Sequence, residues 1–245
     1  MPENNVSKTP SQTKKSKLTL PQLTAYVPYD IPETFPLLIS GGREPERGWL
    51  QKMAGSHPLW AIDHGLDTCR TIGLTPALLL GDGDSADPEA WLQTETAGVP
   101  TKRYPKAKDY TDTQLALQLA AEQKHPFALI TGAFGGRLDH LYSLTVSSAF
   151  APSPLRCLLA DEQEALFFLR ADESMELDFG RRPESLSLLP FTTRCLGVSS
   201  TGLHWPLKRA TITQSIPNAT SNWVKADKVT LSVEHGVLGV HLFWA

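Results

Sequence analysis

This sequence has few cysteines, no long apolar run and no surplus of basic residues. Cys69, Cys157 and Cys195 form no CxxC pair, which leaves no signature of a zinc site or a disulfide framework. We therefore expect three buried thiols in a reducing, cytoplasmic protein. A formal net charge of −3 at pH 7 provides no basic surface for nucleic acid. No apolar run approaches the roughly 20 residues of a spanning helix, and the first residues lack an apolar signal core, so we expect no membrane partner.

The sequence also lacks the motif G-x-x-x-x-G-K-[ST], which argues against a P-loop kinase. Its composition is that of a globular protein, with 245 residues of which 41% are hydrophobic. A chain of this length has room for one large domain or for two smaller ones, each with a real core.

Composition divides the chain into three parts. Residues 1–20 are polar and basic and cannot bury a core, so we expect a disordered tail. Residues 30–162 alternate short apolar runs with helix-forming segments, which predicts a mostly parallel sheet flanked by helices. The expected strands are Pro36–Ser40, Leu59–Ile62, Pro76–Gly81, Thr101–Tyr104, Phe127–Thr131 and Arg156–Ala160. The expected helices are Glu46–Ala54, Asp87–Glu95, Thr113–Gln123 and Leu138–Phe150.

Residues 163–245 show short strand patterns and no helical stretch, which predicts a smaller all-β domain of the sandwich or barrel kind. The candidate strands are Ala165–Leu169, Ser185–Leu189, Cys195–Val198, Val229–Val233 and Leu238–Leu242. The last two flank Glu234-His235-Gly236 and predict a β-hairpin. The predicted fold class is thus an α/β domain followed by an all-β domain.

Four aspartates in two short segments are the most informative feature of the chain. Asp82 and Asp84 follow an expected buried strand, at the sheet edge where α/β proteins bind ligands. Because side chains alternate along a strand, these two carboxylates are expected to share a side. Clustered carboxylates repel one another, and a hard cation such as Mg²⁺ or Ca²⁺ would stabilise them. The structural alternative is a polar turn after a strand.

The second acidic segment, Lys108–Asp112, precedes a predicted helix. Thr111 and Gln114 match a capping box, which places Asp109 just before the helix and Asp112 in its first turn. The helix dipole alone favours acidic residues there, so the metal interpretation rests on the two segments together.

A third segment follows the expected strand Phe127–Thr131. Its glycines permit a close approach of the backbone to a ligand. A helix beginning near Arg137 would direct amide groups at an anion, and the Arg137 guanidinium suits phosphate. The alternative is a glycine turn with Arg137 and Asp139 solvated, and a packed or capping role for His140.

Taken in order, the three segments resemble the motifs of the thiamine pyrophosphokinase family. The family pattern G-D-x-D-S is matched by Gly81–Ser85, K-D-x-T-D by Lys108–Asp112, and G-x-x-G-G-R-x-D-H by Gly132–His140. Ser200–Leu207 and Ser221-Asn222 resemble later family segments, so the resemblance extends over residues 35–245.

This resemblance implies transfer of a pyrophosphoryl group from ATP to the hydroxyl of thiamine, with Mg²⁺ as cofactor and AMP as product. It also implies a homodimer that builds each site from the α/β domain of one subunit and the β domain of the other. The implied metal and catalytic residues are Asp82, Asp84, Asp109 and Asp112, with Asp109 or Asp112 favoured as the base. The implied nucleotide and phosphate ligands are Gly41, Gly42, Ser85, Lys108, Thr111, Gly135, Gly136, Arg137, Asp139 and His140, and the implied thiamine ligands are Trp205, Ser221 and Asn222.

The sequence leaves three points open. His64 stands where the family has a glycine, which removes backbone freedom next to the expected nucleotide loop. Trp205 and Trp223 fit core packing at least as well as stacking on a heterocycle. The alternatives to thiamine transfer are a Mg²⁺-dependent nucleotide pyrophosphohydrolase and a non-catalytic thiamine or nucleotide sensor.

Overall fold

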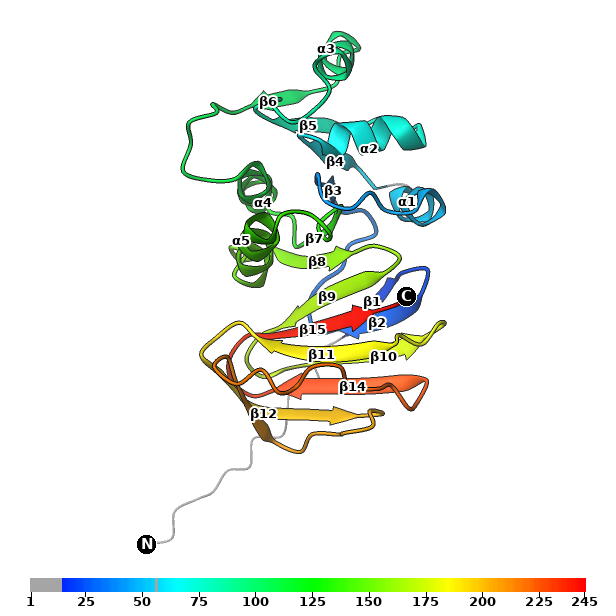
Figure 1. The fold of residues 1–245 in the computed structure, drawn as a ribbon, viewed down its shortest axis with the longest axis vertical. Helices are drawn as coiled ribbons and strands as arrows, with labels where there is room; N and C mark the ends of the chain where they lie inside the picture. Colours follow the sequence, from blue (N-terminus) through cyan, green and yellow to red (C-terminus); the bar gives the residue numbers. More distant parts are fainter. Residues whose placement is uncertain (1–14, 56) are drawn as a thin grey trace, which may run out of the picture.

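Within residues 15–55 and 57–245, the strands form one sheet of nine and one of six strands (Figure 1). The structure is a computed structural model that describes residues 15–55 and 57–245. Within these residues, no helix has the length and apolar character needed to cross a membrane. The three cysteines are buried free thiols, as predicted.

The α/β part of the chain follows the predicted alternation closely. Its strands are β3 (Leu37–Ile39), β4 (Leu59–Ile62), β5 (Leu78–Gly81), β6 (Thr101–Arg103), β7 (Phe127–Thr131) and β8 (Arg156–Ala160). Its helices are α1 (Arg47–Ala54), α2 (Gly65–Ile72), α3 (Pro88–Thr96), α4 (Asp112–Glu122) and α5 (Leu138–Ala149).

Helix α2 is the one element of this part that the sequence pattern did not predict. It has only eight residues, and polar Asp67, Thr68, Arg70 and Thr71 interrupt its apolar positions. A glycine marks the end of this helix. Gly73 adopts the left-handed conformation, and its amide bonds back to the last turn.

The remaining strands complete a two-layer β part. They are β1 (Ser16–Thr19), β2 (Leu23–Val27), β9 (Glu164–Leu169), β10 (Glu173–Phe179), β11 (Ser185–Pro190), β12 (Arg194–Thr201), β13 (Ala210–Thr213), β14 (Lys228–Val233) and β15 (Leu238–Phe243). The nine-stranded sheet has the order β11-β15-β9-β8-β7-β3-β4-β5-β6, and the six-stranded sheet β1-β2-β10-β14-β12-β13. The predicted fold class, a parallel sheet flanked by helices followed by an antiparallel β part, is confirmed.

Both faces of the nine-stranded sheet are covered, because its central strands are apolar on both sides. One face packs on α4 and α5 through side chains such as Leu38 and Trp60. On the other face, Leu37 and Ile39 belong to a core that includes residues of α1 and α2 and continues between the two sheets. Figure 1 shows these helix pairs on opposite sides of the sheet. The domain boundary between residues 162 and 163 stays a prediction, and the larger sheet runs across it, since β8 pairs with β9.

The predicted hairpin of the last two strands is wrong. β14 pairs with β10 and β12 in the smaller sheet, whereas β15 pairs with β9 and β11 in the larger one. The turn Glu234-His235-Gly236 therefore carries the chain from one sheet to the other. Alternation of apolar residues predicts which side of a strand faces the core, but it does not predict the neighbour with which the strand pairs.

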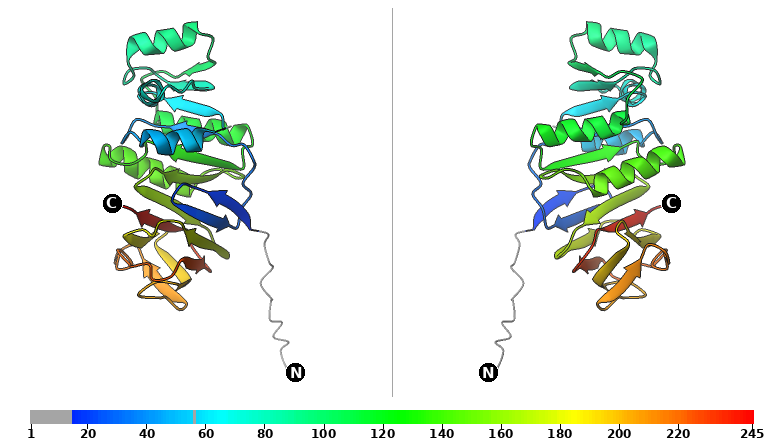
Figure 2. Two further views of the ribbon diagram at one scale, coloured as in Figure 1. Left: turned by 90° about the vertical axis from the view of Figure 1, so that its right-hand side faces the viewer. Right: turned by 90° about the vertical axis from the view of Figure 1, so that its left-hand side faces the viewer.

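The predicted tail of residues 1–20 is also wrong at its end. Residues 1–14 lie outside the described residues, but Ser16–Thr19 form β1, which pairs with β2. β2 pairs in turn with β10, so the hairpin β1-β2, which is blue in Figure 2, belongs to the smaller sheet. Leu18 and Leu20 are buried there, which the polar composition around them obscures.

We predict that β1 contributes to stability. A chain that begins at residue 21 loses the buried Leu18 and Leu20, and each buried leucine contributes roughly 1.5–3 kcal/mol. Its free energy of unfolding should therefore lie about 3–6 kcal/mol below that of a chain beginning at residue 15, measured by urea denaturation. Equal urea midpoints for the two chains would contradict the contribution of β1.

Candidate active site

A pocket opens where the order of the parallel strands reverses. β3 is followed by β4, β5 and β6 on one side, whereas β7, its other neighbour, is followed by β8. At such a switch point the loops after neighbouring strands diverge and leave a crevice at the carboxyl ends of the strands. The pocket of about 420 Å³ is lined by the loops after β3, β4 and β7 and by residues at the start of α4 and α5.

Two glycine loops form the floor of this pocket. The amide of Gly42 donates to the carbonyl of Gly132 at 2.7 Å, so the loops after β3 and β7 remain paired beyond the strands. A Cβ atom at Gly42 would lie 2.5 Å from the carbonyl oxygens of Gly132 and Phe134, so no other residue fits. Of the four glycines expected to approach the nucleotide, Gly41, Gly42 and Gly136 line the pocket, whereas Gly135 does not and lies against Arg43.

Three carboxylates meet at one side of the pocket. Asp63 follows β4, Asp82 follows β5, and Asp112 opens α4. Each offers an oxygen, and these oxygens all lie within 4.8 Å of one another. Among the described residues, Asp112 Oδ1 is buried without a hydrogen-bond partner. This donor set, made only of carboxylate oxygens, matches the ligands that hard divalent cations prefer.

Lys108 lies against two of the three carboxylates. Its ammonium is 2.8 Å from Asp82 Oδ2 and 2.7 Å from Asp112 Oδ2. Burial disfavours the charged form of Asp82, but hydrogen bonds from Lys108 and from the Asp84 amide outweigh burial and lower the pKa of Asp82. Burial and the neighbouring charge of Asp112 raise the pKa of Asp63 to about 7. The site therefore holds one carboxylate whose ionisation is costly next to two that pair with a cation.

The two other predicted aspartates lie outside this cluster. The chain turns at Gly83, where φ is +75°, so Asp82 and Asp84 do not share a strand side and that expectation is wrong. The Asp84 amide instead donates to Asp82 Oδ1 at 3.0 Å, and the Asp84 carboxylate is 3.7 Å from Lys106. Asp109 is exposed.

Asp63 is the member of the cluster that sequence reasoning missed. The signal was available, because Asp63 directly follows an apolar strand just as the Asp82 segment does. Its neighbour His64 lies in ordinary right-handed conformation, with φ −56°, so the loss of glycine freedom expected there has no backbone cost. In the segment Asp63-His64-Gly65, a side chain is excluded at Gly65 instead, whose Cβ would lie 1.9 Å from the Ile39 carbonyl oxygen.

Groups suited to phosphate line the same pocket. Arg137 and His140 lie at the start of α5, and Ser85 and Thr111 complete this side. Arg137 pairs with Asp139 at 2.6 Å, and both side chains are exposed, so the guanidinium is free to exchange its partner for a phosphate. The predicted capping box of α4 is confirmed, since Thr111 and Gln114 bond to each other's amides.

A separate aromatic cluster lies in the β part, outside the residues that line the pocket. The rings of His204, Trp205 and Trp223 have centroid separations of 4.4, 5.1 and 5.4 Å. Trp205 and Trp223 are more than half exposed, which excludes core packing for both. Such a surface suits stacking on a flat ring.

Asn222 holds this cluster in place. Its side-chain amide accepts from the Trp205 amide at 3.1 Å and donates to the Trp205 carbonyl at 2.8 Å. Ser221 has a positive φ of 56°, and its amide donates to Ser187 Oγ at 3.0 Å. The two residues thus fix the loop that carries Trp205.

Comparison with known proteins yields two family models in the same order along the chain. The model described as thiamin pyrophosphokinase, catalytic domain, matches residues 50–152, which contain the carboxylate cluster. The model described as thiamin pyrophosphokinase, vitamin B1 binding domain, matches residues 174–238, which contain the aromatic cluster. The chain belongs to the thiamine pyrophosphokinase family.

Individual relatives agree with this thiamine pyrophosphokinase assignment. Thiamine pyrophosphokinase of Bacillus subtilis is 28% identical over 204 residues, which cover 82% of this chain and 94% of the relative. Thiamine pyrophosphokinase 1 of Oryza sativa subsp. japonica is 24% identical over 171 residues, or 66% of this chain and 64% of the relative.

Solved structures of the same family share the fold. The crystal structure of the Bacillus subtilis thiamine pyrophosphokinase superposes with a TM-score of 0.76 at 22% identity, covering 87% of this chain and all of the other. That of the yeast enzyme gives 0.69 at 15% identity, covering 88% of both chains.

We predict that Asp63→Asn stabilises the metal-free protein at neutral and alkaline pH. Because the folded state raises the pKa of Asp63 to about 7, wild type loses stability as pH rises from about 4 through 7. The variant should gain roughly 1–3 kcal/mol at pH 8 in EDTA, after allowance for solvent screening, and nothing at pH 3.5.

The matched control is Asp109→Asn, an exposed aspartate near the same helix, whose effect should stay within about 0.5 kcal/mol. Urea denaturation across this pH range provides the measurement. A constant difference between Asp63→Asn and wild type at every pH would contradict the costly ionisation of Asp63.

Proposed function

We propose that this protein transfers a pyrophosphoryl group from ATP to the hydroxyl of thiamine, giving thiamine diphosphate and AMP. In this reaction the hydroxyl oxygen bonds to the β-phosphorus, the bond between the α,β-bridging oxygen and the β-phosphorus breaks, and AMP leaves with that oxygen. The observation that carries the proposal is the cluster Asp63, Asp82 and Asp112 beside a glycine-lined pocket, within the region that matches the catalytic-domain model.

We assign the glycine-lined pocket to ATP. Gly41, Gly42 and Gly136 let the backbone approach the nucleotide, and the remaining groups bind phosphate oxygens. Those groups are Ser85, Lys108, Thr111, Arg137 and His140; Asp139 would orient Arg137 through their ion pair, and Gly135 would support the loop. Lys108 and Arg137 are now paired with carboxylates, and a triphosphate offers both of them an anionic partner of higher charge.

The carboxylates fit a bound Mg²⁺. Asp63, Asp82 and Asp112 would hold it, with Asp84 and Asp109 close to the phosphates, and the unpartnered Asp112 Oδ1 would gain a ligand bond. When bound, the cation supplies charge neutralisation on the triphosphate and alignment for in-line attack. Asp112 lines the pocket, which favours it over the exposed Asp109 as the group that accepts the hydroxyl proton.

We assign thiamine to the aromatic cluster of the β part. Trp205 and Trp223 present exposed rings, and Asn222 and Ser221 keep the Trp205 loop in position. Since these rings are not among the residues that line the ATP pocket, a single chain leaves the two substrates on separate surfaces.

A homodimer would join these surfaces, with the aromatic cluster of one subunit facing the ATP pocket of the other. Leu138 and Tyr142 support this arrangement, because both are exposed on α5 next to the pocket-lining Arg137 and Leu141. Exposed apolar side chains beside a site are typical of an interaction surface. We place the enzyme in the cytoplasm, where its three thiols would remain reduced.

Two other functions fit the same site less well. A nucleotide pyrophosphohydrolase would release AMP without thiamine, but it has no need of an exposed aromatic cluster. A sensor would have no use for three carboxylates held within 4.8 Å, whose mutual repulsion is costly. The observations therefore favour the transferase.

We predict that turnover depends on Mg²⁺ through the cluster. Asp82→Asn and Asp112→Asn should each lower AMP release by about a hundredfold or more, because the cation contributes several kcal/mol of charge stabilisation. AMP release from ATP, with and without thiamine, is measured over a range of Mg²⁺ concentrations. Asp30→Asn, an exposed aspartate in the loop after β2, is the control and should retain full turnover. Wild-type turnover in EDTA would refute the role of the cation.

We also predict complementation between subunits. Asp82→Asn lacks the metal site, and Asn222→Ala releases Trp205, which should weaken thiamine binding by roughly 1–3 kcal/mol. If each site takes one part from each subunit, mixed dimers contain one intact site, and random mixing should restore roughly a quarter of wild-type turnover. Turnover no higher than the mean of the two separate variants would contradict a shared site.

A further inference from the structure

We propose that Arg43 is a positioning residue that fixes the two glycine loops of the nucleotide pocket to the β part of the chain. Arg43 itself does not line the pocket, although Gly41 and Gly42, which precede it, do. The inference rests on the proposed function only in that it takes this pocket to be the ATP site.

The backbone of Arg43 joins the two loops. Its amide donates to the carbonyl of Phe134 at 2.6 Å, next to the bond from the Gly42 amide to Gly132. On the side-chain side, a Cβ at Gly135 would lie 2.8 Å from the Arg43 Cβ, so the loop after β7 lies directly on Arg43. Any shift of Arg43 must therefore move both loops.

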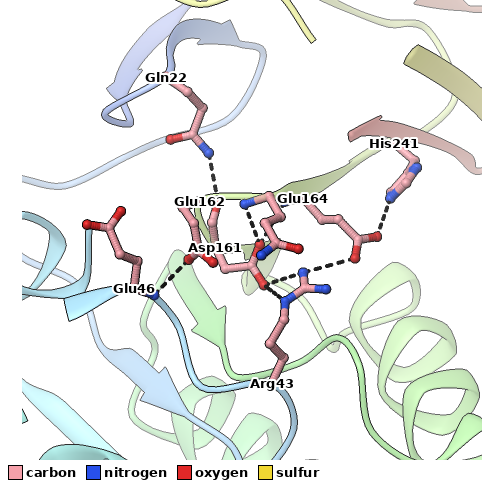
Figure 3. A network of polar contacts seen from close by, with 8 residues as sticks. Gln22, Arg43, Glu46, Asp161, Glu162, Glu164 and His241 are labelled. Carbon is pink, nitrogen blue, oxygen red and sulfur yellow. Dashed lines mark hydrogen bonds and ion pairs between the residues drawn. The ribbon is translucent and has the colours of Figure 1, made fainter. Parts of the chain in front are cut away.

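The guanidinium of Arg43 is anchored at the junction of the two parts of the chain. Nε and Nη2 donate to Asp161 Oδ2 at 3.2 and 2.7 Å, and Nη2 also donates to Glu164 Oε1 at 2.9 Å. Asp161 follows β8 and Glu164 opens β9, so the ion pairs hold the turn at which the sheet changes from parallel to antiparallel (Figure 3).

Asp161 makes this anchor rigid. It is fully buried, and its other oxygen, Oδ1, accepts from the amides of Gln163 and Glu164 at 2.9 and 2.7 Å. Its backbone carbonyl accepts from Gln22 in the turn between β1 and β2, as Figure 3 shows. A buried carboxylate also needs a counter-charge, and Arg43 provides it at Oδ2.

The network continues into the last strand. Glu164 Oε2 lies 2.8 Å from Nε2 of His241, which is on β15 (Figure 3). The His241 ring packs edge-on against Phe134. A closed path thus runs from the Gly42 loop through Arg43 and Glu164 to His241 and back to the loop after β7. Because the planar guanidinium bonds both carboxylates at once, lysine cannot replace it in full.

The test uses full-length Arg43→Lys. Lysine keeps a cation for Asp161, but it loses the simultaneous hydrogen bonds of the guanidinium to Asp161 and Glu164. Hydrogen exchange of the Gly42 and Arg43 amides should become about tenfold faster. Affinity for a non-hydrolysable ATP analogue with Mg²⁺, measured by calorimetry, should fall about fivefold or more, while thiamine affinity changes less than twofold.

Arg103→Lys provides the matched control. Arg103 makes two hydrogen bonds to the single carboxylate of Glu95, at 2.9 and 2.8 Å, on the edge strand β6 and away from the pocket lining. Arg103→Lys should change neither the hydrogen exchange of the Gly42 amide nor the affinity for the ATP analogue. An effect seen only in Arg43→Lys then depends on the position of Arg43 and not on replacing an arginine by lysine.

Three results would overturn the proposal: unchanged exchange and analogue affinity in Arg43→Lys, equal losses in the control, or equal losses of both ligands together with a lowered melting temperature. If Arg43→Lys does not fold, Glu164→Ala, which leaves the Asp161 bonds intact, should show a smaller increase of exchange in the same loops, and no increase overturns the proposal. Wild type that releases no AMP with thiamine would refute the proposed function alone, because exchange and analogue binding do not depend on that reaction.

Discussion

The central position of β3 is the constraint on which the rest of the structure depends. β3 pairs in parallel with β4 on one side and with β7 on the other. The strands that follow β3 in the sequence are therefore added on one side of it up to β6, and the next strand, β7, lies on its other side. This reversal opens the pocket and brings two glycine loops within backbone hydrogen-bond distance. It also delivers the ends of β4 and β5, with their aspartates, to the same rim as the start of α4.

Electrostatic strain follows from that convergence. Asp63, Asp82 and Asp112 repel one another, and Lys108 compensates two of them, which leaves Asp63 with a pKa raised to about 7. A protein selected for stability alone would not gather these charges. At the carboxyl end of β8, which pairs in parallel with β7, the buried Asp161 has Arg43 as its counter-charge, although burial still raises the pKa of Asp161. Removing such a partner from a buried charge typically costs about 3–5 kcal/mol. Asp161 thus has a cation and two backbone donors, whereas Asp112 Oδ1 has no hydrogen-bond partner among the described residues.

Sequence reasoning succeeded where a local signal decides the structure. Apolar runs predicted β4, β7 and β8 to the residue, and the Thr111 capping box predicted the start of α4. It failed where the outcome depends on distant partners. The sequences of β14 and β15 do not indicate that the two strands join different sheets. Likewise, β1 can be recognised as a strand only from the core residues against which Leu18 and Leu20 pack. Asp63 was missed for a different reason. Its position directly after an apolar strand is a local signal, but it lies outside the three motifs of the family resemblance.

The family resemblance implies that Ser221 and Asn222 are thiamine ligands, which stays a prediction. In this structure the Asn222 side-chain amide bonds both backbone groups of Trp205. We propose that Asn222 contributes to thiamine binding by holding this exposed ring in place as a flat surface. Because stacking tolerates any flat heterocycle, specificity for thiamine requires further groups that meet this ring when the site is complete. In the homodimer proposed above, the second subunit would supply those groups, which is the physical reason to propose a shared site.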